Sequence, residues 1–199
     1  MKIIVVGGTG TIGQAVVQQL SPRHTIITAG REHGDIRVNV ADKKSIEKMY
    51  QTAGKVDAVI ATAGSVHFGA LTEMTDEHYQ IGLQNKLMGQ VNLVLIGLQY
   101  LHDAGSFTLT SGILSHDPIR YGSSASMVNG ALEGFVKSAA IEMPKNIRIN
   151  VVSPTVLTES MGAYAEYFRG FESVAAARVA LAYSKSVEGA QTGQVYNVG

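Results

Sequence analysis

The chain has 199 residues, close to the usual size of one domain, so we expect one domain over residues 1–199. Lysine plus arginine and aspartate plus glutamate number 16 each, which excludes the basic field of a nucleic-acid-binding or anionic-membrane-binding protein. Hydrophobic residues at 45% argue against disorder, and the lack of cysteine excludes disulfides, a thiolate nucleophile and cysteine-ligated zinc.

The first third of the chain alternates short apolar runs with amphipathic stretches. Residues 3–6 are continuously apolar and end in a glycine, as in a strand buried on both faces of a parallel sheet. A helix follows, whose apolar residues at helical spacing are Ile12, Val16, Val17 and Leu20. Pro22 ends that helix, and β-branched residues predict strands over 25–28 and 36–40.

A second helix is predicted after Asp42, whose side chain is placed to cap it. Its apolar stripe is Ile46, Met49, Tyr50 and Ala53. The alternation then continues with predicted strands over 58–60, 106–110, 148–152 and 195–196, and predicted helices over 75–102, 125–142 and 174–187. Strand and helix in alternation indicate an α/β fold, a Rossmann-type doubly wound parallel sheet of about seven strands with helices on both faces.

The start of the chain predicts no targeting segment. The first expected strand begins at Lys2, which leaves no room for a basic region followed by an apolar core. No stretch reaches the roughly 18 apolar residues that a membrane span needs. Together with the absence of cysteine, this leads us to expect a cytoplasmic protein without membrane or nucleic-acid partners.

A glycine-rich turn joins the first strand to its helix. Residues 7–13 read Gly-Gly-Thr-Gly-Thr-Ile-Gly, and glycines at this place let the backbone approach a pyrophosphate. The phosphate charge then lies at the free N–H groups and positive end of the helix. The turn therefore predicts a dinucleotide-binding site.

The residue after the second strand predicts which dinucleotide binds. An acidic side chain there accepts hydrogen bonds from a ribose 2′-hydroxyl, whereas an arginine pairs with a 2′-phosphate. This chain has Arg31 at that place, followed by Glu32. We expect NADP(H) to be favoured over NAD(H), with a solvated loop arginine as the alternative.

Several landmarks resemble the short-chain dehydrogenase/reductase family over nearly the whole chain. Residues 7–13 resemble its glycine loop, although Thr11 stands at the middle glycine, and Asn39-Val40 stands where the family has an aspartate and an apolar residue at the adenine. Residues 61–64 resemble the Asn-Asn-Ala-Gly turn, with both asparagines replaced, and residues 153–155 resemble the Pro-Gly segment at the nicotinamide. The lead into the last strand, residues 192–195, matches the family's Thr-Gly-Gln. The candidate cofactor-binding residues are Gly7, Thr9, Gly10, Thr11, Ile12, Gly13, Arg31, Asn39, Val40, Ala63, Gly64, Asn129, Pro154, Thr155 and Val156.

The resemblance also implies a catalytic serine, a tyrosine acid/base and a lysine four residues after the tyrosine, which binds the ribose and lowers the tyrosine pKa. If Tyr121 is the acid/base, Ala125 takes the lysine position and Thr108 the serine position. A second alignment, on Gly134-Phe135 and on residues 139–142, fits better. It puts Ala125 on the tyrosine, Asn129 on the lysine and Gly112 on the serine, with Ser111 one residue away.

Neither alignment supplies the lysine, so the family's usual proton relay is expected to be broken. Asn129 is a neutral amide that can bond a ribose hydroxyl but cannot stabilise a tyrosinate. The candidate catalytic residues are Ser111, to orient the substrate oxygen, and the loop residue Tyr121, to supply the proton with help from His116 or Lys86. An ordinary loop aromatic is the alternative for Tyr121. The family's asparagine falls on Asn85 by residue type and on Lys86 by its distance from Gly89.

Further features concern partners and substrate. The six histidines show no paired ligand spacing, so no metal site is expected. Small residues recur in the predicted helices 75–102 and 125–142, which in the family build the subunit interface and here imply a homodimer or homotetramer. The aromatic residues between Pro154 and Phe171 fall where the family has a substrate lid, which implies an apolar small-molecule substrate.

Three functions are compatible with these residues. The first is an NADP(H)-dependent oxidoreductase that transfers hydride between the nicotinamide and a small carbonyl or alcohol substrate. The second is a catalytically degenerate NADP(H)-binding sensor or scaffold, which the missing tyrosine and lysine favour. The third is an epimerase or isomerase that retains its nucleotide.

Overall fold

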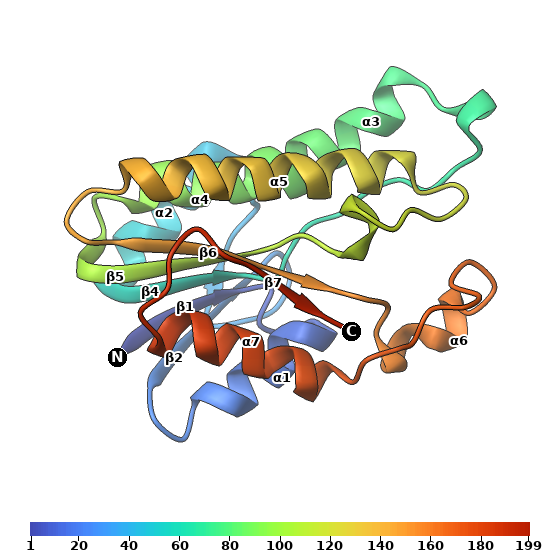
Figure 1. The fold of residues 1–199 in the computed structure, drawn as a ribbon. Coiled ribbons are helices and arrows are strands. Elements are labelled where there is room, and N and C mark those ends of the chain that lie inside the picture. The colour runs from blue at the N-terminus through green and yellow to red at the C-terminus, as the bar shows by residue number, and fades with distance from the viewer.

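The computed structural model describes residues 1–199 and is organised around one seven-stranded sheet (Figure 1). The strands lie in the order β3-β2-β1-β4-β5-β6-β7, and every neighbouring pair is parallel. Their bounds are β1 Lys2–Val6, β2 Thr25–Gly30, β3 Ile36–Arg37, β4 Val56–Ala61, β5 Leu101–Thr110, β6 Arg148–Pro154 and β7 Val195–Val198. The strand order reverses between β1 and β4, where ligands bind in doubly wound folds. The predicted Rossmann-type fold is confirmed.

Helices cover both faces of the sheet. Helices α1 (Thr11–Leu20) and α7 (Ala176–Glu188) pack together on one face. Helices α2 (Lys43–Ala53), α4 (Met88–Gly97) and α5 (Ser123–Glu142) cover the other, as Figure 1 shows. The shorter pieces are α3 (Asp76–Gly82), α6 (Met161–Tyr164), the π-turn η2 (Leu83–Leu87) and the 3₁₀ turns η1 (Leu71–Glu73), η3 (Ile113–Ser115) and η4 (Thr158–Ser160). No helix has both the length and the apolarity to cross a membrane.

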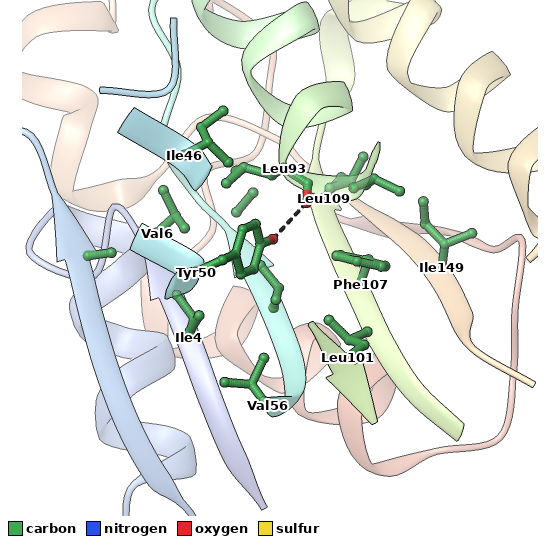
Figure 2. Packing of buried hydrophobic residues seen from close by; sticks show 14 of the residues in the cluster. Ile4, Val6, Ile46, Tyr50, Val56, Leu93, Leu101, Phe107, Leu109 and Ile149 are labelled. Atoms are coloured by element: carbon green, nitrogen blue, oxygen red, sulfur yellow. Dashed lines mark hydrogen bonds between the residues drawn. The ribbon is translucent and has the colours of Figure 1, made fainter. Parts of the chain in front are cut away.

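The larger part of the core lies beneath α2, α4 and α5. Tyr50 is fully buried there, and its hydroxyl donates a hydrogen bond of 2.6 Å to the carbonyl oxygen of Leu93 (Figure 2). The phenol ring stacks on Tyr100 with 5.1 Å between ring centroids. A polar group is tolerated in this core because its hydrogen bond is satisfied.

The sequence predicted α2 in detail. The Asp42 side chain accepts a hydrogen bond from the Lys44 amide at 2.9 Å, as a helix cap does. All four residues of the predicted stripe, Ile46, Met49, Tyr50 and Ala53, are buried. Cap and stripe are therefore confirmed.

The predicted helix over 75–102 is confirmed over residues 76–97 and is too long at its C-terminal end. It consists of α3, the π-turn and α4, and α4 ends at Gly97. The chain then turns, with the Tyr100 amide donating to the Gly97 carbonyl at 2.8 Å and the Tyr100 carbonyl accepting from Val56 at 3.0 Å. Pairing with β4 draws these residues into the sheet, because a backbone partner in the core outweighs helix propensity.

The predicted strand over 36–40 is too long, since β3 holds only Ile36 and Arg37. Beyond it the Asn39 amide donates to the Ser45 hydroxyl at 2.9 Å, and the Asn39 carbonyl accepts from Asp42 at 3.0 Å. These bonds turn the chain into α2. The predicted helix over 174–187 begins instead at Ala176, because Val174 forms a β-bridge with Leu157.

Candidate functional site

The turn between β1 and α1 is closed tightly enough to require glycine. Gly7 has a φ of 84°, and its amide donates to the Ala29 carbonyl at the end of β2 at 2.7 Å. A Cβ on Gly13 would overlap the Gly7 carbonyl oxygen and lie 2.7 Å from the Gly8 Cα. The start of α1 therefore presses directly on the loop backbone, and a side chain at position 13 has no room.

Helix α1 leaves its first amides without partners. Gly10 is the N-cap and supplies no side-chain cap, and the first helical bond runs from Gln14 to the Gly10 carbonyl at 2.8 Å. The amides of Thr11, Ile12 and Gly13 donate to no carbonyl of the preceding loop. Free amides at the positive end of a helix form an anion site. The turn thus fits the pyrophosphate of a dinucleotide.

A cavity of about 260 Å³ lies beside this turn, at the carboxyl ends of β4, β5 and β6. It brings together more than half of the predicted site residues outside the glycine loop. Those that line it are Ala63, Gly64, Ser111, Asn129, Pro154, Thr155 and Val156, and Ile12 of the glycine loop joins them. Its remaining wall is largely apolar and includes Phe68 and Phe168.

Three side chains, those of Gln90, Lys86 and Asn129, form hydrogen bonds with the backbone at the end of β5. Gln90 bonds both backbone groups of Thr110: its Nε2 donates to the carbonyl at 2.9 Å, and its Oε1 accepts from the amide at 2.8 Å. The next carbonyl, of Ser111, accepts from Lys86 Nζ at 2.9 Å. The carbonyl after that, of Gly112, accepts from Asn129 Nδ2 at 3.1 Å. Three consecutive carbonyls are thus fixed by side chains from η2, α4 and α5.

Asn129 also presents an unused acceptor. The residue is 3% exposed, and its Oδ1 has no hydrogen-bond partner. A buried acceptor without a donor is unfavourable unless a ligand supplies one. The side chain lines the cavity, where a sugar hydroxyl would satisfy it. This orphaned oxygen is a second feature that fits a bound dinucleotide.

Ser111 lines the cavity, but its hydroxyl hydrogen is engaged elsewhere. Ser111 Oγ donates to Glu133 Oε1 at 2.9 Å, and Ser115 Oγ donates to the same oxygen at 2.8 Å. A hydroxyl has one hydrogen to donate. While the bond to Glu133 holds, Ser111 can accept a hydrogen bond from a substrate but cannot give one. Sequence reasoning did not single out Glu133, which lies on α5 far along the chain.

Tyr121 does not line the 260 Å³ cavity. Its side chain is 40% exposed and lines a neighbouring cavity of about 640 Å³ with Tyr164 and Tyr167. The rings of Tyr121 and Tyr167 meet edge to face at 6.1 Å. Phe68 lines both cavities. To act on a substrate in the 260 Å³ cavity, the Tyr121 side chain would have to move out of the neighbouring cavity and past Phe68. Its catalytic role therefore stays a prediction.

Of the two residues that the sequence left open, Lys86 faces the cavity. Asn85 Nδ2 donates to the Ile81 carbonyl of its own helical segment at 3.1 Å. Lys86 is partly buried, and no ion pair of the structure involves it. Burial lowers the pKa of Lys86 to about 8, because the charged ammonium loses hydration. The spacing to Gly89 was the signal that pointed to this residue.

The end of β2, which Arg31 directly follows, lies close to the glycine loop. A Cβ on Gly30 would lie 3.8 Å from Thr9 Oγ1, so the loop and the end of β2 are neighbours. Arg31 is exposed and makes no ion pair. Asp35 accepts hydrogen bonds from the Thr28 amide at 2.8 Å and from its hydroxyl at 2.7 Å, which lowers the pKa of Asp35. These bonds fold the short loop that carries Arg31 back against β2.

The remaining predicted pair, Asn39 and Val40, precedes α2. Asn39 Oδ1 accepts from the Ala41 amide at 3.2 Å and so stabilises the local turn. Val40 packs against α4, where a Cβ on Gly89 would be 3.1 Å from the Val40 side chain. Neither residue lines the 260 Å³ cavity, and their assignment to the adenine stays a prediction.

Comparison with known protein sequences identifies a family model and relatives that this chain resembles. A family model described as "Enoyl-(Acyl carrier protein) reductase" matches residues 12–196. An uncharacterised oxidoreductase of Methylorubrum extorquens is 28% identical over 63% of this chain and 51% of its own length. A 3-ketodihydrosphingosine reductase of Bacteroides thetaiotaomicron is 26% identical over 76% of this chain and 62% of its own length. The chain thus spans roughly half to two thirds of these relatives.

Solved structures agree with the sequence match. The protein lin1944 from Listeria innocua is 52% identical, with all of both chains covered and a TM-score of 0.99. A small-chain dehydrogenase in complex with NADPH is 27% identical, with 100% of this chain and 96% of that chain covered and a TM-score of 0.88. Family model, fold and glycine turn agree, and the chain belongs to the short-chain dehydrogenase/reductase family of nicotinamide-dependent oxidoreductases.

Proposed function

We propose that residues 1–199 form one domain that binds NADP(H) and transfers hydride between its nicotinamide and a small carbonyl or alcohol. The observation that carries this is the set of free amides of Thr11, Ile12 and Gly13 at a turn whose backbone leaves no room for a side chain at position 13. These amides bind the pyrophosphate, and Asn129 Oδ1 accepts from a ribose hydroxyl. When bound, the cofactor supplies or accepts the hydride. The apolar cavity wall excludes water from the reacting atoms.

The preference for NADP(H) rests on Arg31. Its guanidinium forms no ion pair, and the residue before it, Gly30, lies next to the glycine loop, near the place that a 2′-phosphate would take. An arginine binds phosphate through charge-assisted hydrogen bonds, which NAD(H) cannot form at this position. The 27% identical dehydrogenase crystallised with NADPH supports the same preference.

Thermal unfolding tests the cofactor assignment. NADPH is expected to raise the Tm of the wild-type protein more than NADH does at equal concentration, and Arg31→Ala is expected to remove the difference. Arg169→Ala removes the same charge from another exposed loop and is expected to keep the wild-type difference. Equal shifts from both cofactors would refute the NADP(H) preference. If neither cofactor raises the Tm, the proposed function fails as a whole.

The catalytic roles of Ser111 and Tyr121 remain predictions of this proposal. Ser111 is at the cavity, with its hydroxyl acting as an acceptor while it donates to Glu133. Tyr121 must leave its contact with Tyr167 to reach a substrate in the cavity. Unchanged turnover in Tyr121→Phe would exclude the phenol as the proton donor.

A second candidate function is an NADP(H)-binding sensor. The observation that favours it is that no tyrosine lines the 260 Å³ cavity and that Ala125 and Asn129 stand there instead. A sensor binds NADPH as proposed above but oxidises it with no member of a panel of aldehydes and ketones. NADPH absorbance at 340 nm, followed with each carbonyl, separates the two functions.

The partner we propose is a second or further copy of this chain. Leu95 and Met88 of α4 are 56% and 41% exposed, and Met127 of α5 is 42% exposed. A groove of about 280 Å³ runs between these two helices and has an apolar lining. Exposed apolar side chains gathered on two helices favour association through that face. We propose a homodimer or homotetramer with this face at its interface.

A further inference from the structure

The cavity beside the glycine turn contains a single side chain that titrates. Among the 19 residues that line it, Lys86 is the only one with an acidic or basic group. A reaction that moves a proton to or from a substrate in this cavity therefore has Lys86 as its one ionisable neighbour within the wall. His116, by contrast, is exposed and bonded to Ser115, outside that wall.

The backbone around Lys86 fixes its side chain in place. A Cβ on Gly64 would lie 2.9 Å from Lys86 Cγ and 3.0 Å from its Cα, so the loop after β4 packs directly on the lysine stem. At the other end, Nζ donates to the Ser111 carbonyl at 2.9 Å. An ammonium has three hydrogens, so two remain after that bond. The side chain is thus held at both ends with protons to spare.

The groups that surround Lys86 leave its charge without a counter-ion. From α5, Ala125 and Asn129 reach the cavity, and both are neutral. The charged residue of α5 at this strand end, Glu133, accepts from two serine hydroxyls rather than from Lys86. From α7, the Tyr183 hydroxyl bonds Thr110, and burial raises the pKa of Tyr183, so it is neutral at physiological pH. From β6, the lining residues are uncharged.

We propose that Lys86, rather than Tyr121, is the catalytic proton donor of this site in carbonyl reduction and the proton acceptor in alcohol oxidation. As hydride from NADPH forms the new C–H bond, the carbonyl π bond breaks and the substrate oxygen takes a proton from Nζ. The substrate is reduced to an alcohol, NADPH is oxidised to NADP⁺, and the neutral amine regains its proton from solvent. This inference rests on the proposed function and names the proton carrier within it.

Lys86 lines the cavity with two Nζ hydrogens left for a substrate oxygen, and its lowered pKa places the proton transfer near neutral pH. The reductase requires the ammonium form. Its rate is therefore expected to be constant below about pH 8 and to fall above it.

The first test measures the lysine directly, without cofactor or substrate. In protein labelled with ¹³C and ¹⁵N lysine, the Lys86 signals are assigned by their absence from Lys86→Met and followed against pH. The expected midpoint of Lys86 is about 8, below the ordinary lysine value of about 10.4. A midpoint of Lys86 near about 10.4 would overturn the proposal, whatever the cofactor does.

The second test compares variants with NADPH and a carbonyl from the panel that the wild-type protein reduces. Lys86→Met removes the proton and the charge, and Lys86→Arg keeps the charge but does not release its proton. Both are expected to lower kcat by about 10²–10⁴-fold, the usual contribution of general acid catalysis, and to lose the fall above pH 8. Lys137→Met is the matched control and is expected to keep wild-type turnover.

Binding and stability measurements separate the possible failures. NADPH fluorescence titration and Tm are expected to stay within about threefold and a few degrees of wild type in both Lys86 variants. Full activity in Lys86→Met, or in Lys86→Arg, would overturn the proposal while leaving the oxidoreductase function intact. If the wild-type protein binds no NADPH or reduces no carbonyl, the proposed function fails first and the proton assignment with it.

Discussion

Replacing Gly13 by alanine tests the physical basis of the cofactor site. The added methyl group would overlap the Gly7 carbonyl oxygen and lie 2.7 Å from the Gly8 Cα. Both neighbours are backbone atoms, so no side-chain rotation relieves the contact. Overpacking of this kind costs about 1–3 kcal/mol, while the gain in helix propensity from glycine to alanine offsets at most about 1 kcal/mol. After the propensity gain is subtracted, the net loss in unfolding free energy reaches about 2 kcal/mol, and we expect a loss near that upper value.

The loss is measurable as a change in Tm and in the response to NADPH. For a chain of this length, about 2 kcal/mol corresponds to a fall of roughly 4–8 °C. Saturating NADPH at 100 times its Kd stabilises a binding protein by about 2.7 kcal/mol, and this gain is expected to vanish because the loop is pushed away from the amides of α1. Differential scanning fluorimetry with and without NADPH reports both quantities.

Gly10→Ala is the matched control in the same loop. Gly10 has an ordinary φ of −79°, and a Cβ there would lie 3.4 Å from the Gly7 carbonyl oxygen, an acceptable contact. We expect a stability change of at most about 1 kcal/mol, from the weaker N-cap. A Gly13→Ala protein that melts and responds to NADPH like the wild type would refute the close approach of α1 to the loop.

Two further predictions concern the core and the assembly. In Gly97→Ala, the new Cβ would lie 2.8 Å from Tyr50 Cζ and 2.9 Å from Phe107 Cε1, which Figure 2 shows in the same cluster, so we expect a loss of about 1–3 kcal/mol in urea unfolding. The double variant with Tyr50→Phe lacks the hydroxyl nearest the new methyl group, so its loss of stability is expected to be smaller than the sum of the two single losses. Strictly additive losses would contradict this. In Leu95→Asp, a charge on the exposed face of α4 is expected to shift the mass measured by light scattering toward the monomer with little change in NADPH binding. An unchanged mass would remove that face from the interface.

Local signals in the sequence predicted what depends on local interactions. The cap at Asp42 and the stripe that includes Tyr50 lie within one helix, and a helix period and a cap preference suffice to identify them. The glycine turn is similar, because the strand before it and the helix after it are contiguous with it. Fold and cofactor site follow from such segments.

The parts that the sequence did not predict depend on contacts between distant segments. The end of α4 at Gly97 is decided by pairing of Tyr100 with Val56, more than 40 residues away. The orientation of the Ser111 hydroxyl is decided by Glu133 on α5. Tyr121 was chosen for its residue type near the expected motif, but its place beside Tyr167 depends on how a later loop packs. The spacing of apolar residues along the sequence carries no information about such contacts between distant segments.

The π-turn at Leu83–Leu87 has a consequence for how related chains can vary. Such a turn contains one residue more than an α-turn, and each residue of a helix advances its neighbours by about 100° around the axis. Losing one residue here would restore a regular helix and leave the faces of α3 and α4 nearly unchanged, because the turn itself takes up the extra residue. Lys86 lies within this turn, so the side chain at its position would point in another direction after such a deletion. Homologues that lack one residue here would keep the sheet but not the proposed proton donor.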